Sequence, residues 1–305
     1  MELAVEQGGF LTWDQARRRG VPRRSLDALV ADSLLEHPLR GVFLVAAQRT
    51  PQERHRLTVA AVLAQYPGHW ASHGSALGLC GAALYGVPLQ KIHLASRRDS
   101  SRTIPGVSHH VLRPGDLTAT LEGQPLVHPA LSCVLVAAAC GREAGVVAMD
   151  SLVHRGLVTC EELVEIVESG RVRRGVRAAR VAVHQVDPAC ESPGESLLRC
   201  RLHDLGLPFD TQVAISTRGR DYRVDFLVRG RTILEFDGRV KYGGADGADA
   251  LVREKRREDE LRLEGFGFLR VVWRDLDNLA ALAAAIDRAS LRADTLESPR
   301  HAEDF

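Results

Sequence analysis

The hydrophobic pattern in the last third of the chain alternates between helical and strand-like spacing. Apolar positions over residues 193–205 recur at helical intervals, and Gly206 follows that stretch. Two strand-like runs flank a three-residue loop with Gly230 at its centre, which is typical of a β-hairpin. The predicted elements are helices at 193–205, 248–264 and 278–290 and strands at 212–216, 222–228, 232–236 and 268–273. Their order is αβββαβ, followed by a closing helix.

The first 48 residues predict two short helices and a hairpin. Thr12 can cap a helix over 13–19, which Gly20 ends, and residues 35–45 have the pattern of a β-hairpin. Helix, tight turn, second helix and hairpin together form the winged-helix pattern found in many DNA-binding domains.

Three polar residues, Arg23, Arg24 and Ser25, lie at the predicted start of the second helix. In a recognition helix this end meets base edges or phosphates, so the three are candidate nucleic-acid contacts. The alternative is a helical protein–protein module with solvated arginines.

The middle of the chain mixes helical and strand-like patterns, and turn-forming residues gather near 48–51 and 186–194. The basic run over 171–180 is interpreted as a solvated linker face, with a phosphate-tracking stripe as the alternative. His69 and His73 lie four residues apart, but the segment between Tyr66 and His69 is turn-like and no third ligand lies nearby in sequence. We therefore expect no zinc site there. The predicted elements are helices at 57–65, 72–81, 129–139, 145–153 and 160–168 and strands at 91–95 and 107–112.

Composition and charge limit the classes of function. The 305 residues include 40 basic and 39 acidic side chains, and the net charge of +1 excludes a uniformly basic nucleic-acid coat. No apolar run reaches the length of a membrane span, and the acidic N-terminus is unlike a secretory signal. The six cysteines form no C-x-x-C pair and are interpreted as reduced thiols. With arginine in excess over lysine, these features predict a cytoplasmic bacterial protein that has no contact with membranes.

The hairpin places two carboxylates opposite each other. If Gly230 is at the centre of the loop, Val228 pairs with Thr232, and Asp225 then pairs directly with Glu235 on one face of the sheet. Like charges in that position are unfavourable, and a divalent cation would compensate them. The pattern therefore predicts a site for Mg²⁺ (or Mn²⁺), with Asp225 and Glu235 as the metal ligands.

Further charged residues complete this candidate site. Asp237 lies on the same strand face as Glu235, and Glu195 on the preceding helix can supply another carboxylate. The nearby cations are Lys241, Lys255 and Arg257. A metal and a cation beside carboxylates are the groups that phosphodiester hydrolysis requires. The alternative is a solvent-facing pair of carboxylates, neutralised by Arg223 and Arg239.

Several segments of this region match a known nuclease pattern. They resemble the PD-(D/E)xK superfamily and, more narrowly, its branch of very-short-patch-repair (Vsr-like) endonucleases. The resemblance implies that Asp225 and Glu235 are metal ligands and that Glu195 is the acid on the helix. The chain departs from the pattern at Asp237, where the superfamily has lysine, so cleavage depends on Lys255 or Lys241 as a substitute. The matching segments are Glu195–Arg199, Val224–Phe226, Leu234–Gly238, Lys255–Asp259 and Phe268–Trp273.

The N-terminal segment matches a second family. Residues Gly9–Thr12, Ala16–Gly20, Leu34–Glu36 and Arg40–Phe43 resemble the N-terminal domain of AbiEi-type abortive-infection antitoxins. In that family the resemblance implies a winged helix that binds operator DNA.

Together these patterns predict an α+β / α/β multidomain protein. The predicted domains are a winged helix over 1–48, a mixed α/β middle domain over 49–187, a restriction-endonuclease-like αβββαβ core over 188–292 and a flexible tail over 293–305. The leading hypothesis is a metal-dependent DNA endonuclease of a bacterial defence or toxin–antitoxin type. The alternative is a DNA-binding regulator or antitoxin with a degenerate nuclease fold, and a third reading is a protein-interaction adaptor. The expected partners are DNA and either a toxin or a second copy of the chain.

Overall fold

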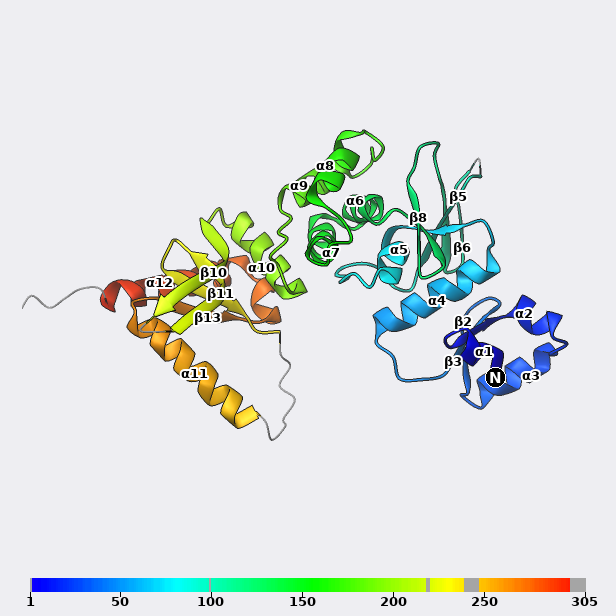
Figure 1. Ribbon diagram of the computed structural model, residues 1–305, viewed down its shortest axis with the longest axis horizontal. Helices are drawn as coiled ribbons and strands as arrows, with labels where there is room; N and C mark the ends of the chain where they lie inside the picture. Colours follow the sequence, from blue (N-terminus) through cyan, green and yellow to red (C-terminus); the bar gives the residue numbers. More distant parts are fainter. Residues whose placement is uncertain (1, 99, 218–219, 239–246, 297–305) are drawn as a thin grey trace, which may run out of the picture. The chain divides into compact units, whose positions relative to one another are not determined.

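The structure is a computed structural model that describes residues 2–98, 100–217, 220–238 and 247–296, with side chains described over 252–292 in the last range. The chain forms two compact units, Met1–Val186 and Asp187–Phe305, each described by itself below (Figure 1). Both units combine helices with β-sheets, so the protein has a mixed α/β fold with several sheets. Among the described residues, no helix has the length and apolar character needed to cross a membrane.

The first 45 residues form a three-stranded sheet with three short helices. The strands lie in the order β1-β3-β2 and are antiparallel. Thr12 caps α2 as expected, and a capping box with Gln15 fixes this end of the helix. Leu11, Leu26 and Phe43 are part of the hydrophobic core between sheet and helices. The elements are α1 (Glu2–Glu6), β1 (Phe10–Thr12), α2 (Trp13–Arg18), α3 (Arg23–Ala31), β2 (Leu35–Leu39) and β3 (Val42–Val45).

Helix α4 (Pro51–Gln65) joins this segment to the middle of the chain. It packs against β1 and β3, and Arg54 forms an ion pair with Glu36 at 2.7 Å. Residues 1–48 and 49–186 therefore belong to one compact unit, and the second unit begins at Asp187.

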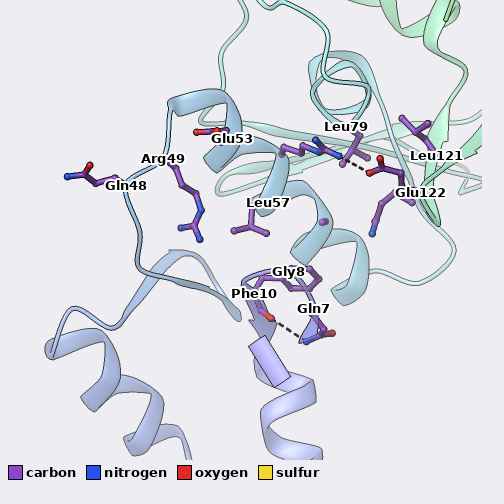
Figure 2. A pocket seen from close by; sticks show the side chains of 13 residues that line it. Gln7, Gly8, Phe10, Gln48, Arg49, Glu53, Leu57, Leu79, Leu121 and Glu122 are labelled. Carbon is purple, nitrogen blue, oxygen red and sulfur yellow. Dashed lines mark hydrogen bonds and ion pairs between the residues drawn. The ribbon is translucent and has the colours of Figure 1, made fainter. Parts of the chain in front are cut away.

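A cavity of about 470 Å³ lies beside this junction, and Figure 2 shows the residues that line it. Its charged side chains already have partners: Arg56 pairs with Glu122 at 2.8 Å, Arg49 donates to the Val45 carbonyl, and Glu53 caps α4. The cavity therefore belongs to the packing of the unit.

A six-stranded mixed sheet organises the rest of the first unit. The strand order is β6-β7-β5-β4-β9-β8, and β5 and β7 are parallel neighbours. Four of these strands are short and were not expected from the sequence, because their hydrophobic pattern covers only two to four residues each. The strands are β4 (Trp70–Ala71), β5 (Ile92–Ser96), β6 (Arg102–Ile104), β7 (Val107–Val111), β8 (Thr118–Leu121) and β9 (Gln124–Val127).

Five helices complete this unit. Part of the basic run predicted as a linker face is in fact helix α9, with Ala179 and Ala182 buried. Gly175 precedes α9 with a φ of +70°, and a side chain there would collide with the Ala138 carbonyl. The helices are α5 (His73–Leu79), α6 (Pro129–Cys140), α7 (Arg142–His154), α8 (Cys160–Glu168) and α9 (Val176–His184).

The second unit has the predicted order of elements. A four-stranded sheet runs β10-β11-β12-β13, with β12 and β13 parallel and the other pairs antiparallel. Helix α12 continues to Leu296, so the tail expected from residue 293 begins inside a helix, and residues 297–305 lie outside the described part. The elements are α10 (Pro193–Asp204), β10 (Phe209–Thr217), β11 (Arg220–Val228), β12 (Thr232–Phe236), α11 (Gly247–Leu263), β13 (Gly267–Val271), a 3₁₀ turn (Trp273–Asp277) and α12 (Leu279–Leu296).

At Gly194, helix α10 lies so close to the end of β12 that no residue with a side chain would fit at this position. A Cβ atom there would lie 1.9 Å from the ring of Phe236. The contact holds the first turn of α10, including Glu195, against the end of the strand that carries Glu235.

We expect Gly194→Ala to destabilise the protein by about 1–3 kcal/mol, because the methyl group overpacks this contact. Urea unfolding of the full chain measures the loss. The matched control is the double variant Gly194→Ala/Phe236→Leu, whose loss should be smaller than the sum of the two single losses because the smaller side chain makes room. If the two losses were additive, the contact between Gly194 and Phe236 would not determine how closely α10 packs against β12.

Candidate functional site

The β11–β12 hairpin has the predicted register. Val228 pairs with Thr232 and Phe226 with Leu234, so the next positions outward are Asp225 and Glu235. The Phe236 N–H donates to Asp225 Oδ2 at 2.9 Å, which fixes the Asp225 carboxylate at the end of β12. The predicted register therefore holds as far as Phe226 and Leu234, and Asp225 and Glu235 are the next residues outward on the two strands.

Glu195 enters from the first turn of α10. Ser192 caps this helix, and the Ser192 hydroxyl also donates to Glu195 Oε1 at 2.6 Å. The Glu191 N–H donates to Glu195 Oε2 at 3.1 Å, and the carboxylate is buried. The spacing Ser192-x-x-Glu195 is itself a sequence signal for this helix start. Glu195 thus has a capping role as well as a place beside the strands.

A further residue at this site, Gln212, carries no signal in the sequence. It lies on β10 between two residues that pair with Phe226 and Val224, which places it opposite Asp225. Its φ is +51°, a conformation that costs a non-glycine residue about 1 kcal/mol or more. Its side-chain amide donates to Glu195 Oε2 at 3.1 Å. This strained strand position thus links β10 to the acid on α10.

The three acids share a negatively charged environment, in which Glu195 is buried and Asp225 and Glu235 are half-buried. Burial raises the pKa of Glu195, and Asp225 raises it further, against the hydrogen bonds from Ser192 and Glu191. Burial likewise raises the pKa of Asp225. Burial raises the pKa of Glu235, Asp225 adds to the effect, and Arg257 opposes it. Burial and mutual repulsion therefore raise the free energy of the charged carboxylates at neutral pH. A divalent cation that prefers oxygen ligands would offset this increase. Carboxylate oxygens are the ligands that Mg²⁺ and Mn²⁺ prefer, and Asp225 and Glu235 are the residues that could hold such an ion.

Within the described part of the chain, Arg257 forms an ion pair with Glu235. Its guanidinium lies 2.6 Å from Glu235 Oε1, donates to the Arg223 carbonyl at 2.6 Å and lies over the Tyr222 ring. Lys255 is exposed, and its position on α11 is about 160° around the helix from Arg257. The structure therefore brings Arg257, and not Lys255, to Glu235.

The remaining predicted residues of this site are Asp237 and Lys241. Asp237 is half-buried directly after β12, and its N–H donates to the Val271 carbonyl at 2.9 Å. Strand alternation puts it on the same face as Glu235. Lys241 lies outside the described residues.

The three candidate nucleic-acid contacts lie in the first turn of α3. The side chain of Arg23 is held in place by an ion pair with Asp27 at 2.9 Å and by its position over the rings of Trp13 and Phe43. Arg24 is exposed and Ser25 is half-buried. Arg23 and Arg24 are thus both exposed, but the contacts of Arg23 with Asp27, Trp13 and Phe43 hold its side chain in place.

Comparison with known proteins gives relatives but no function. No model of a known protein family matches the chain. The chain is 28% identical over 280 residues to uncharacterized proteins from two strains of Mycobacterium tuberculosis, and the match covers 88% of this chain and 98% of each relative.

We expect Mg²⁺ to stabilise the full chain against heat, because a cation that binds the folded carboxylates shifts unfolding by mass action. Asp225→Asn should remove this shift and, without metal, should leave stability equal or higher, because it deletes a half-buried charge and retains an acceptor for the Phe236 N–H. Differential scanning fluorimetry with and without EDTA measures both effects. An undiminished Mg²⁺ shift in the variant would contradict the assignment of Asp225.

Proposed function

We propose that the protein is a metal-dependent DNA endonuclease with an N-terminal DNA-binding module. The observation that carries the proposal is the pair of half-buried carboxylates, Asp225 and Glu235, directly beyond the last pair of the β11–β12 ladder, where Asp225 raises the pKa of both Glu235 and Glu195. Neighbouring negative charges destabilise the folded state, so their presence here favours a catalytic role over a structural one.

In this proposal Asp225 and Glu235 hold Mg²⁺ or Mn²⁺, which would polarise a phosphate and lower the pKa of a water molecule. Glu195 acts as a positioning residue, because its hydrogen bonds from Ser192 and Gln212 fix the charge that faces Asp225. Asp237 adds a carboxylate on the same strand face as Glu235 and tightens cation binding.

Arg257 takes the part that lysine plays in the nuclease pattern. It is already within contact of Glu235, and its guanidinium can donate to a phosphate in place of the carboxylate once a metal neutralises Glu235. The same ion pair competes with metal for Glu235, so Arg257 is expected to weaken metal affinity and to assist the reaction.

The second candidate function is a DNA-binding regulator or antitoxin with a degenerate nuclease fold. Two observations favour it: Asp237 stands where the superfamily has lysine, and an arginine already neutralises Glu235. The resemblances to AbiEi-type antitoxins and to Vsr-like endonucleases fit either function within bacterial defence or a toxin–antitoxin pair.

The N-terminal segment supports DNA binding in both proposals. Helices α2 and α3 with the β2–β3 hairpin have the element order of a winged helix, in which α3 enters the major groove. Arg24 at the exposed start of α3 is placed to contact a phosphate.

We expect wild-type protein to cleave plasmid DNA with Mg²⁺ or Mn²⁺, and Asp225→Ala to abolish cleavage. Arg257→Gln should lower the rate by about 100-fold or more, because the transition state loses its cation. Arg257→Lys should restore part of that rate. Gel assays of nicking and linearisation measure all three variants.

Lys255→Ala is the matched control on the same helix. It should cleave at the wild-type rate, since Lys255 is exposed and away from Glu235. If Lys255→Ala lost cleavage, Lys255 and not Arg257 would be the cation that assists the reaction. Absence of cleavage by the wild type with either metal on DNA and RNA substrates would favour the regulator.

A separate prediction concerns DNA binding measured in EDTA. Arg24→Ala should reduce the slope of log K against log salt by about 1, the value for one lost phosphate contact. The control is Arg180→Ala, on the exposed side of the basic run in α9, which should leave the slope unchanged. Fluorescence anisotropy over a salt series distinguishes them, and the reverse result would assign DNA binding to the basic run.

A further inference from the structure

Three histidines from separate segments meet in the first unit. His73 begins α5, His93 lies on β5 and His110 lies on β7. The parallel pairing of β5 with β7 places Ala95 opposite His110, so His93 and His110 project from the same face of the sheet. One nitrogen of each ring lies within 4.8 Å of the other two, and these three residues are called the histidine trio below.

The geometry within the trio is close to that of a metal site. His93 Nδ1 and His110 Nε2 face each other at 2.9 Å, and the rings of His73 and His110 stack with centroids 4.2 Å apart. Two imidazole nitrogens on one tetrahedral zinc ion lie about 3.3 Å apart, given zinc–nitrogen bonds of about 2.0–2.1 Å. The two nitrogens, His93 Nδ1 and His110 Nε2, are 2.9 Å apart, so they need to move apart by only about 0.4 Å for a zinc ion to replace the hydrogen between them.

The charge state of the trio suits ligation. Burial, together with the charges of His110 and Lys91, lowers the pKa of His93 to about 4. Burial also holds the pKa of His73 well below its usual value and lowers that of His110. The three rings are therefore neutral at physiological pH, and neutral imidazole is the form that binds metal.

The surrounding structure fixes the ring of His73 in place. Its backbone φ is +50°, a strained conformation for a residue with a side chain. Its Nδ1 lies 2.8 Å from the hydroxyl of Ser72, which is buried, so the other nitrogen is left for a ligand role. Strain at a residue held by a neighbouring hydrogen bond is typical of a functional position.

His93 is held from its backbone. Its N–H donates to the buried hydroxyl of Ser75 at 2.9 Å, and the Ser75 hydroxyl lies 3.3 Å from His55 Nε2. Ser75 is thus committed to this network, which positions the strand that carries His93.

A basic cavity of about 580 Å³ adjoins the trio. His73 and His110 line it, together with Asp116 and four arginines: Arg113, Arg171, Arg173 and Arg174. Asp116 pairs with Arg171 at 3.3 Å, which leaves a net positive lining. Such a cavity suits an anionic group next to the histidines.

We propose that His73, His93 and His110 form a zinc-type metal site whose remaining coordination position opens to an anion in the arginine-lined cavity. Three histidines with one open position is the ligand set of catalytic rather than structural zinc. Its nitrogen donors separate it chemically from the carboxylates of the second unit, which prefer Mg²⁺ or Mn²⁺. The proposal is therefore independent of the endonuclease function.

The test is titration of untagged full-length Asp225→Ala protein with Co²⁺ and Zn²⁺, so that the carboxylate site does not contribute. We expect one equivalent of Co²⁺ with the visible absorption of a four-coordinate ion, displaced by one equivalent of Zn²⁺. His110→Ala and His93→Ala should each remove the absorption, and Ser72→Ala should weaken Zn²⁺ binding by about 10- to 100-fold.

His109→Ala is the matched control, since His109 is the neighbouring strand residue and contacts Tyr66 and His69 instead of the trio. It should bind metal like the parent protein. No stoichiometric binding by the parent, binding that survives His110→Ala, or binding that His109→Ala removes would each overturn the site. Circular dichroism of every variant establishes that a loss of metal is not a loss of fold.

Inorganic phosphate tests the open position. Phosphate added to the Co²⁺ form should shift the visible spectrum, and the double variant Arg173→Ala/Arg174→Ala should need at least about 10-fold more phosphate for the same shift, since two charged hydrogen-bond donors are lost. A spectrum that phosphate leaves unchanged would overturn the anion part of the proposal.

Discussion

The pairing of β11 with β12 across a three-residue loop is the constraint on which the second unit depends. It brings Asp225 and Glu235 to the same end of the hairpin, where both are half-buried and the charge of Asp225 raises the pKa of Glu235. A slip of one residue would move one acid to the opposite face of the sheet and remove the repulsion. The fold instead keeps the register, with Gly230 at positive φ in the loop and the Phe236 N–H bound to Asp225.

Arg257 shows how the unit tolerates this charge. The residue connects α11 to both strands of the hairpin, because it pairs with Glu235 and donates to the Arg223 carbonyl. An arginine in this place favours the charged form of both carboxylates, since it lowers the pKa of Asp225 and of Glu235 against the effect of burial. Under the proposed endonuclease function, the same side chain would serve stability without metal and activity with metal, and it could not pair with Glu235 and with a phosphate at the same time.

The two compact units separate two kinds of ligand chemistry. The second unit gathers hard carboxylate oxygens at the end of a hairpin, and the first gathers neutral imidazole nitrogens beside a basic cavity. In both places the backbone accepts strain where a side chain must be held, at Gln212 in one and at His73 in the other. The cost of each strained residue is about 1 kcal/mol or more, which packing around it must offset.

Local sequence determined the elements whose signals are contained in a few neighbouring residues. The cap at Thr12, the strand over 232–236, the loop at Gly230 and the resulting pairing of Val228 with Thr232 all follow from turn chemistry and alternation. Tertiary structure alone decided which residues from distant segments meet. The sequence pointed to Lys255, but the face of α11 that packs on the sheet brings Arg257 to Glu235. In the sequence, no third ligand lies near His73. The pairing of β4, β5 and β7 in the folded sheet brings His93 and His110 next to it. A helix or strand pattern specifies which side of an element is apolar, and only the packing of whole elements specifies what lies opposite that side.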